Sequence, residues 1–152
     1  MLKISKADYD LIRWEAERSY PYECCGILLG TTAGQTRSVA LTLTCENMRS
    51  DSAANRYSID PGRVIAALKL ARSRSESIIG FYHSHPDHPP QYSATDLLEA
   101  HWFDCSYVIT GVSKGAAQAT RSFLLLGSEE QKTFQEEHIE IVELDRSLPI
   151  AL

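Results

Sequence analysis

The sequence predicts an α/β or α+β fold, with one mixed β-sheet packed between helices. Segments with the apolar spacing of helices alternate along the chain with short β-branched or aliphatic runs that glycine or proline bounds. The order is helix, hairpin, helix, strand, helix and further strands, which favours helices packed on a mixed sheet. Because no linker, repeat or low-complexity tract interrupts the sequence, one domain is expected over residues 1–152.

Three segments are expected to be helical, each with a recognisable first turn. Ser5 can cap the first helix, and Asp60 followed by Pro61 suits the start of the second. The third helix is expected to start at a serine that precedes an apolar run. The expected helices cover residues 5–20, 60–75 and 93–103.

The expected strands are short runs rich in β-branched or aliphatic residues. The run CGILLG precedes the turn TTAGQ and the run TRSVALTLT, so these two runs form a predicted hairpin. The other strands follow from further apolar runs and from the alternation in HIEIVEL. The expected strands cover residues 25–30, 36–44, 57–60, 77–85, 106–112, 120–127 and 138–144.

Composition and charge narrow the possible functions. The 15 Lys and Arg against 20 Asp and Glu give a net charge of −5, and no nucleic-acid partner is expected because phosphate binding needs a basic surface. No apolar run is long enough to cross a bilayer, and no secretory signal is recognisable, so a cytoplasmic protein without a membrane partner is expected. The four cysteines, none in Cys-x-x-Cys spacing, fit reduced thiols and not a disulfide framework or a cysteine zinc site.

The stretch FYHSHPDHPPQYSATD, residues 81–96, carries most of the functional information. Residues two apart in a strand share a face, so His83 and His85 point the same way. The proline after them stops the strand, and Asp96 lies in the first turn of the next helix, where its carboxylate can reach the same point. Two histidines, one aspartate and a water make a four-coordinate zinc site with one open position. Each part has a plainer reading, because His-x-His occurs by chance and Ser93 with Asp96 is also an ordinary helix start.

The spacing resembles the signature of the JAMM (MPN+) zinc metallopeptidases, in which His-x-His is followed by ten residues and Asp, with Ser three residues before Asp. An upstream glutamate completes the likeness, because PYECCGILLG places Glu23 before a Cys-Gly pair that enters a strand. Two motifs about sixty residues apart are more specific together than either is alone. The chain is similar to the compact prokaryotic members of this family. The resemblance implies a curved sheet in a layered fold like that of the cytidine deaminases.

The resemblance also implies roles for five residues. His83, His85 and Asp96 look like the ligands of one Zn²⁺ per chain, which would lower the pKa of its water to about 7 and polarise a scissile carbonyl. Glu23 looks like the general base that takes the proton of that water and then, as an acid, passes it to the leaving amine. Ser93 looks like the hydrogen-bond donor to the oxyanion, a task that competes for geometry with capping the helix.

The implied activity is hydrolysis of the amide or isopeptide bond after the C-terminal Gly-Gly of a ubiquitin-like protein or of a sulfur carrier of the ThiS/MoaD type. The glycine tail is expected to add to a strand edge near DSAANRYSI, and family members often form homodimers. One alternative is a non-catalytic MPN-type scaffold that binds proteins. Another is a DNA-associated RadC-like member, which the acidic charge disfavours. His88, in the loop between the motifs, is expected to be exposed and not a ligand.

Overall fold

The computed structural model describes residues 1–49 and 56–143, and it confirms the expected mixed sheet packed between helices. Within these residues, eight strands form one sheet in the order β7-β6-β5-β4-β2-β3-β1-β8. The strands are β1 (Leu2–Ser5), β2 (Cys25–Ala33), β3 (Thr36–Cys45), β4 (Ser77–Pro86), β5 (Ser106–Ser113), β6 (Ala116–Ser128), β7 (Gln131–Glu137) and β8 (Ile139–Val142). The helices are α1 (Lys6–Ser19), α2 (Pro61–Ser73) and α3 (Ala94–Glu99).

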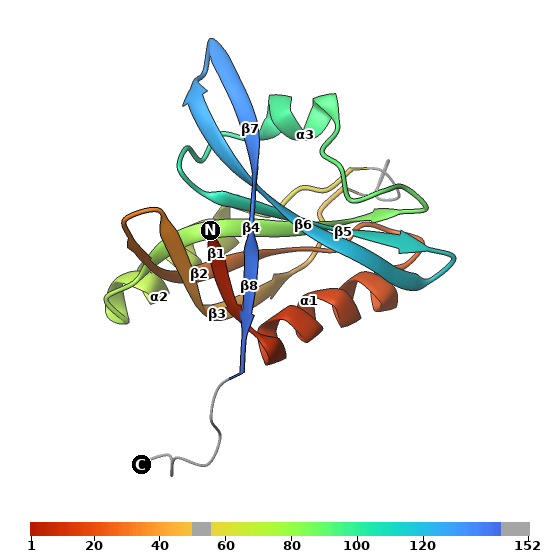
Figure 1. Cartoon of the computed structure of the whole chain (residues 1–152), viewed down its shortest axis with the longest axis horizontal. Helices are drawn as coiled ribbons and strands as arrows, with labels where there is room; N and C mark the ends of the chain where they lie inside the picture. Colours follow the sequence, from red (N-terminus) through yellow and green to blue (C-terminus); the bar gives the residue numbers. More distant parts are fainter. Residues whose placement is uncertain (50–55, 144–152) are drawn as a thin grey trace.

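The sheet curls until its two outer strands meet. β7 forms one edge and β8 the other, yet a single residue, His138, separates them in the sequence. Figure 1 shows β7 running directly into β8. The pairing is mixed, because β1 is parallel to β3 and β8, β4 is parallel to β5, and the other pairs are antiparallel. The curvature that the family resemblance implies is therefore present.

Helices cover both faces of the sheet, with α1 and α3 on opposite sides in Figure 1. On the α1 face, Ile12 and Ala16 join a buried cluster with side chains of β1, β2, β4 and β5. On the other face, here called the α2 face, Ala67 and Ala71 lie in a second cluster, against which Leu97 of α3 packs. Each fully buried aliphatic side chain contributes about 1.5–3 kcal/mol, so these clusters hold the layers together. Among the described residues, no helix has the length and apolar character that crossing a bilayer requires.

A bulge in β4 determines which face carries the histidines. Relative to β2, β4 has one extra residue between Ile78 and Gly80. The extra residue reverses the alternation, so that Ile78 and Phe81 both pack on the α2 face. Alternation resumes beyond Phe81, so His83 and His85 lie on the α2 face as Phe81 does.

Two strands lie outside the expected set. β1 has four residues, and its parallel pairing with β3 and β8 depends on segments far along the chain. β7, with the sequence QKTFQEE, has mostly exposed side chains and pairs with β6 at the edge of the sheet. Both strands are therefore determined by tertiary pairing more than by local propensity.

Three expected boundaries are corrected. The strand expected over 57–60 is wrong, because these residues form no regular element. The helix expected over 93–103 is too long: α3 ends at Glu99, since Ala100 adopts an extended backbone and buries its side chain. The strand expected over 138–144 is the shorter β8, and residue 144 of the expected strand lies outside the described range.

Candidate active site

The three residues expected to bind metal lie together at the end of β4. The Nε2 atoms of His83 and His85 are 3.2 Å apart. Asp96, in the first turn of α3, places Oδ1 3.3 Å from Nε2 of His83 and Oδ2 3.0 Å from Nε2 of His85. One carboxylate therefore meets both imidazoles, each through a separate oxygen.

The orientation of His85 makes this donor set suitable for a metal ion. Its Nδ1 lies 3.0 Å from the carbonyl oxygen of Pro89, and because a carbonyl only accepts, Nδ1 must carry the hydrogen. In the neutral ring, Nε2 then presents a lone pair to Asp96 and to the neighbouring imidazole. Such an arrangement needs a cation between the groups, either a proton or a metal ion, and a backbone carbonyl behind a ligand histidine is a common support for metal binding.

The charges of the three groups follow from burial and from their contacts. Burial raises the pKa of Asp96, but hydrogen bonds from His83 and His85 outweigh burial and hold this pKa well below its usual range. Burial lowers the pKa of His83 more than Asp96 raises it, so His83 is neutral at neutral pH. Burial also lowers the pKa of His85, yet hydrogen bonds to Asp96 and Pro89 reverse the effect and raise this pKa. A metal ion would replace the proton that His85 shares with Asp96.

Glu23 lies beside the histidine pair, just before β2, and its side chain is 3% exposed. Ligand atoms of Glu23, His83 and His85 all lie within 4.8 Å of one another. Burial raises the pKa of Glu23 to about 8, with contributions of the same sign from Asp96 and Glu99 and an opposing one from His85. A carboxyl group that titrates near neutrality can both accept and donate a proton.

The backbone around Glu23 is fixed by contacts that the sequence did not identify. The hydroxyl of Ser84, on β4, accepts a hydrogen bond of 2.8 Å from the N–H of Cys24. The carbonyl oxygen of Glu23 accepts one of 3.2 Å from Nδ2 of Asn47. A Cβ added at Gly26 would lie 2.1 Å from the ring of Tyr82, so glycine permits this close approach of β2 to β4. The glycine of the Cys-Gly pair therefore has a packing reason.

Ser93 caps α3 and fixes Asp96. Its Oγ accepts a hydrogen bond of 3.0 Å from the N–H of Asp96, and its own N–H donates to Oδ2 of Asp96 at 2.8 Å. This reciprocal capping box uses the hydroxyl as an acceptor. A hydroxyl also has one hydrogen to donate, so capping the helix leaves Ser93 one hydrogen bond to give.

Two further residues beside His83 and His85 were missed at the level of sequence. Tyr57 stacks on the ring of His83 with 4.4 Å between centroids. Pro89 contributes its carbonyl oxygen to His85, a contact of the backbone that leaves no signal in residue type. By contrast, His88 is exposed, as expected.

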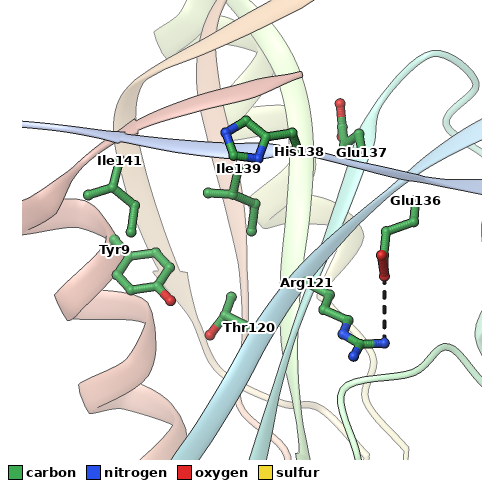
Figure 2. A pocket seen from close by; sticks show the side chains of 8 residues that line it. All are labelled: Tyr9, Thr120, Arg121, Glu136, Glu137, His138, Ile139 and Ile141. Atoms are coloured by element: carbon green, nitrogen blue, oxygen red, sulfur yellow. Dashed lines mark ion pairs between the residues drawn. The ribbon is translucent and has the colours of Figure 1, made fainter.

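Several cavities of similar size need to be distinguished. A cavity of about 400 Å³ opens beside the site, and its lining consists of Glu23, Arg56, His85, Pro86, His88, Pro89, Gln91, Ser93 and Thr95. A cavity of about 430 Å³ lies elsewhere, between α1, β6, β7 and β8. Figure 2 shows that Arg121 reaches Glu136 there, with 3.6 Å between Nη1 and Oε1. Neither that cavity nor one of about 390 Å³ beside Tyr57 and Trp102 is lined by Glu23 or by a histidine of the pair. The first cavity is lined by both Glu23 and His85, so it is the candidate active site.

Comparison with known proteins shows the family of this chain. The model of the family described as prokaryotic homologs of the JAB domain matches residues 5–126. The chain belongs to this family. The resemblance inferred from the two motifs is thus confirmed.

Two curated relatives are similar to part of this chain. A desampylase from Haloferax volcanii is 37% identical over 92 residues, which cover 59% of this chain and 62% of the relative. A probable TtuB-protein conjugate cleaving protease from Thermus thermophilus is 34% identical over 97 residues, which cover 64% of this chain and 60% of the relative. This JAB-family chain thus matches less than two thirds of the length of either relative.

Two solved structures are similar over nearly the whole chain. The solution structure of a protein from Desulfitobacterium hafniense has a TM-score of 0.80 and 27% identity, and the match covers 96% of both chains. The solution structure of a protein from Salinibacter ruber has a TM-score of 0.66 and 34% identity, with 97% of this chain and 95% of that chain covered. This JAB-family chain therefore shares its architecture with these two proteins along nearly its whole length.

Proposed function

We propose that this chain is a zinc-dependent peptidase that hydrolyses the amide or isopeptide bond after the C-terminal Gly-Gly of a ubiquitin-like or sulfur-carrier protein. The observation that carries the proposal is the convergence of His83, His85, Asp96 and Glu23 beside one open cavity. A relative named for cleaving TtuB-protein conjugates supports a protein conjugate as the substrate class.

We assign His83, His85 and Asp96 as the metal ligands and Glu23 as the acid and base. Geometry allows a second set, because Glu23 also lies near both imidazoles. Asp96 contacts each imidazole through a separate oxygen, whereas the pKa of Glu23, raised to about 8, suits proton transfer. Zinc held by the assigned ligands would polarise the scissile carbonyl and activate a water.

Glu23 takes a proton from the attacking water and delivers it to the leaving nitrogen. Ser93, Pro89 and Tyr57 complete the site. The free hydroxyl hydrogen of Ser93 donates to the oxygen on which negative charge develops. Pro89 orients His85 through its carbonyl oxygen, and Tyr57 covers the ring of His83, so that the imidazoles are preorganised.

The glycine tail of the carrier is proposed to bind along a strand edge next to the site. The segment DSAANRYSI, which the sequence suggests for this purpose, lies partly outside the described residues. One domain over residues 1–152, a homodimer and a cytoplasmic location stay predictions.

Cleavage of a defined conjugate tests the proposal. The wild-type protein, loaded with zinc, is expected to release the leaving group from a ThiS-type carrier joined through its terminal glycine, and Glu23→Gln is expected to lower kcat by about 10²- to 10⁴-fold. Mass spectrometry of the intact carrier measures both rates. Full activity of Glu23→Gln would contradict the mechanism, and a wild-type protein without stoichiometric metal or cleavage would favour a protein-binding scaffold.

A further inference from the structure

We propose that the cavity beside Glu23 selects leaving groups that carry a free carboxylate, through Arg56 and His88. The expected leaving group is an α-amino acid whose carboxylate lies one carbon from the released nitrogen. This inference rests on the proposed peptidase function and deepens it, because it specifies what the same site releases.

The position of Glu23 locates the leaving group. Since Glu23 delivers the proton to the leaving nitrogen, this nitrogen and its substituents lie on the same side of the scissile bond as Glu23. The cavity of about 400 Å³ that contains Glu23 is also lined by His85 and Ser93. The leaving group therefore extends along the rest of this lining, where Arg56 and His88 lie.

The lining of this cavity favours a negative charge. Among its described residues, Glu23 is the one acid, whereas Arg56 is a cation and His88 is a further hydrogen-bond donor. Gln91 and Thr95 add neutral donors. This concentration of donors is notable in a chain of net charge −5, and it suits a carboxylate better than a cationic or apolar leaving group.

The acids near the cavity have partners elsewhere, so they do not cancel its donors. Both oxygens of Asp96 face the imidazoles. Glu99 pairs with Arg49 at 3.2 Å. Asp87 accepts hydrogen bonds from the hydroxyl of Tyr20 at 2.7 Å and from the backbone N–H of residue 114 at 2.9 Å.

Backbone contacts tie both selecting residues to the catalytic ones. Nδ2 of Asn47 donates to the carbonyl oxygen of Arg56 at 3.0 Å and to that of Glu23 at 3.2 Å, so one amide group holds both segments. The N–H of His88 donates to the carbonyl oxygen of His85 at 3.3 Å. The backbone segments that carry the two side chains are thus both joined to the segments of the site.

A lysine side chain joined by an isopeptide bond would gain nothing from these residues, because no carboxylate lies close to its nitrogen. The proposal therefore predicts discrimination between two kinds of conjugate that the general peptidase chemistry treats alike. Charge on the leaving group, and not its size, is the property that this cavity detects.

Three conjugates of one ThiS-type carrier test the proposal. The terminal glycine is joined to alanine, to alanine amide, or to the side-chain nitrogen of a lysine whose own amino and carboxyl groups are blocked. We expect the wild-type kcat/KM for the alanine conjugate to exceed that for the alanine amide conjugate by about tenfold, the effect of one hydrogen bond to a charged group. Arg56→Gln should raise KM for the alanine conjugate, so that its kcat/KM falls to that for the alanine amide conjugate. His88→Ala should reduce the difference in part.

Arg74→Gln is the matched control, because Arg74 is an exposed arginine paired with Glu76 at the far end of α2. This variant should keep the wild-type preference. Equal wild-type cleavage of alanine and alanine amide conjugates would overturn this inference alone, as would an Arg56→Gln variant that keeps the tenfold preference. Failure to cleave any of the three conjugates would overturn the proposed peptidase function and this inference with it.

Discussion

Among the described residues, two clusters of buried or largely buried polar side chains differ in how their charges are balanced. The metal cluster, at the end of β4, consists of Glu23, His83, His85 and Asp96. The seam cluster, close to the point where β7 becomes β8, consists of Arg37, Ser106, Ser122 and Glu137.

In the seam cluster, the chain itself supplies the opposite charges. Oε2 of Glu137 accepts hydrogen bonds from the hydroxyls of Ser106 at 2.6 Å and Ser122 at 2.8 Å. Its other carboxylate oxygen lies 3.7 Å from Nη1 of Arg37, and Nε of Arg37 donates to the carbonyl oxygen of Asp104 at 2.6 Å. The same carboxylate oxygen lies 3.1 Å from the N-terminal ammonium of Met1, so the chain pairs this buried carboxylate with two cations and holds strands together without any external group.

The metal cluster is not complete in this sense. Two imidazole nitrogens face each other at 3.2 Å, and the orientation of His85 directs a lone pair toward Asp96. A proton or a bound metal ion would complete this arrangement. A buried polar cluster whose charges are balanced from within supports the fold, whereas one that needs an added cation indicates a binding site.

Removal of a proposed ligand should separate the clusters most clearly. His83→Gln is expected to lose zinc and to lower kcat/KM for carrier cleavage by more than about 1,000-fold, because the metal supplies several kcal/mol of transition-state stabilisation. Elemental analysis and the conjugate assay measure both effects. Ser122→Ala, in the seam cluster, is the control and should keep both the zinc and the activity; loss of zinc in this control would undermine the distinction.

The converse change, in the seam cluster, should affect stability and not metal binding. Glu137→Leu leaves Arg37 buried without its carboxylate, and we expect a loss of about 3–5 kcal/mol in the free energy of unfolding. Urea denaturation measures the loss. The double variant Arg37→Met with Glu137→Leu should recover most of it, since the one charge left without its carboxylate, the N-terminal ammonium of Met1, is partly exposed to water. A double variant as unstable as the single one would show that the ion pair is not the cause.

Ser93 allows the capping role to be separated from the catalytic role. Ser93→Ala should lose about 1 kcal/mol of stability, because the cap of α3 is removed, and should also lower kcat by about 100-fold through the missing hydrogen-bond donor. Ser5→Ala removes the corresponding cap of α1, where the hydroxyl accepts from the N–H of Asp8 at 3.1 Å. This control should show the same loss in thermal or urea unfolding with no change in kcat. Equal kcat losses in both variants would contradict a catalytic role for Ser93.

The buried carboxyl group of Glu23 predicts a pH dependence in the metal-free protein. Its pKa is raised from 4.5 to about 8, chiefly by burial, so between these values the folded protein keeps a proton that the unfolded chain has lost. Raising the pH therefore lowers the stability of the wild type, whereas Glu23→Gln has no such group. The stability difference in favour of Glu23→Gln should grow by about 2 kcal/mol between about pH 5.5 and about pH 7. Urea denaturation in the presence of a chelator measures it, and a difference that is independent of pH would exclude a buried carboxyl with a raised pKa.

Much of the fold follows from local sequence signals. The hairpin of β2 and β3, the capped start of α2 and the buried strands β4 and β5 have strong local patterns. β1 and β7 do not, because one is four residues long and the other has an exposed polar sequence. The length of α3 was also not predicted, because the helix ends at the buried Ala100 and not at a helix-breaking residue.

The site shows the same division. His83, His85, Asp96, Ser93 and Glu23 were inferred because side chains of particular types recur at a spacing typical of one family. Residues that act through the backbone or by stacking carry no such signal, since their part depends on where the folded chain brings them. Only the folded structure identifies two such contacts. The carbonyl oxygen of Pro89 orients His85, and the amide of Asn47 joins the segments of Glu23 and Arg56.

The zinc content of two matched variants tests the central assignment most directly. Glu23→Gln and Asp96→Asn each replace one carboxylate beside the same two histidines with its amide. Elemental analysis of the purified proteins should find about one zinc per chain in the wild type and in Glu23→Gln, and a large loss in Asp96→Asn, since a ligand carboxylate is removed in the latter alone. Zinc that is lost from Glu23→Gln and retained by Asp96→Asn would contradict the account, because Glu23 would then be the ligand and Asp96 would not.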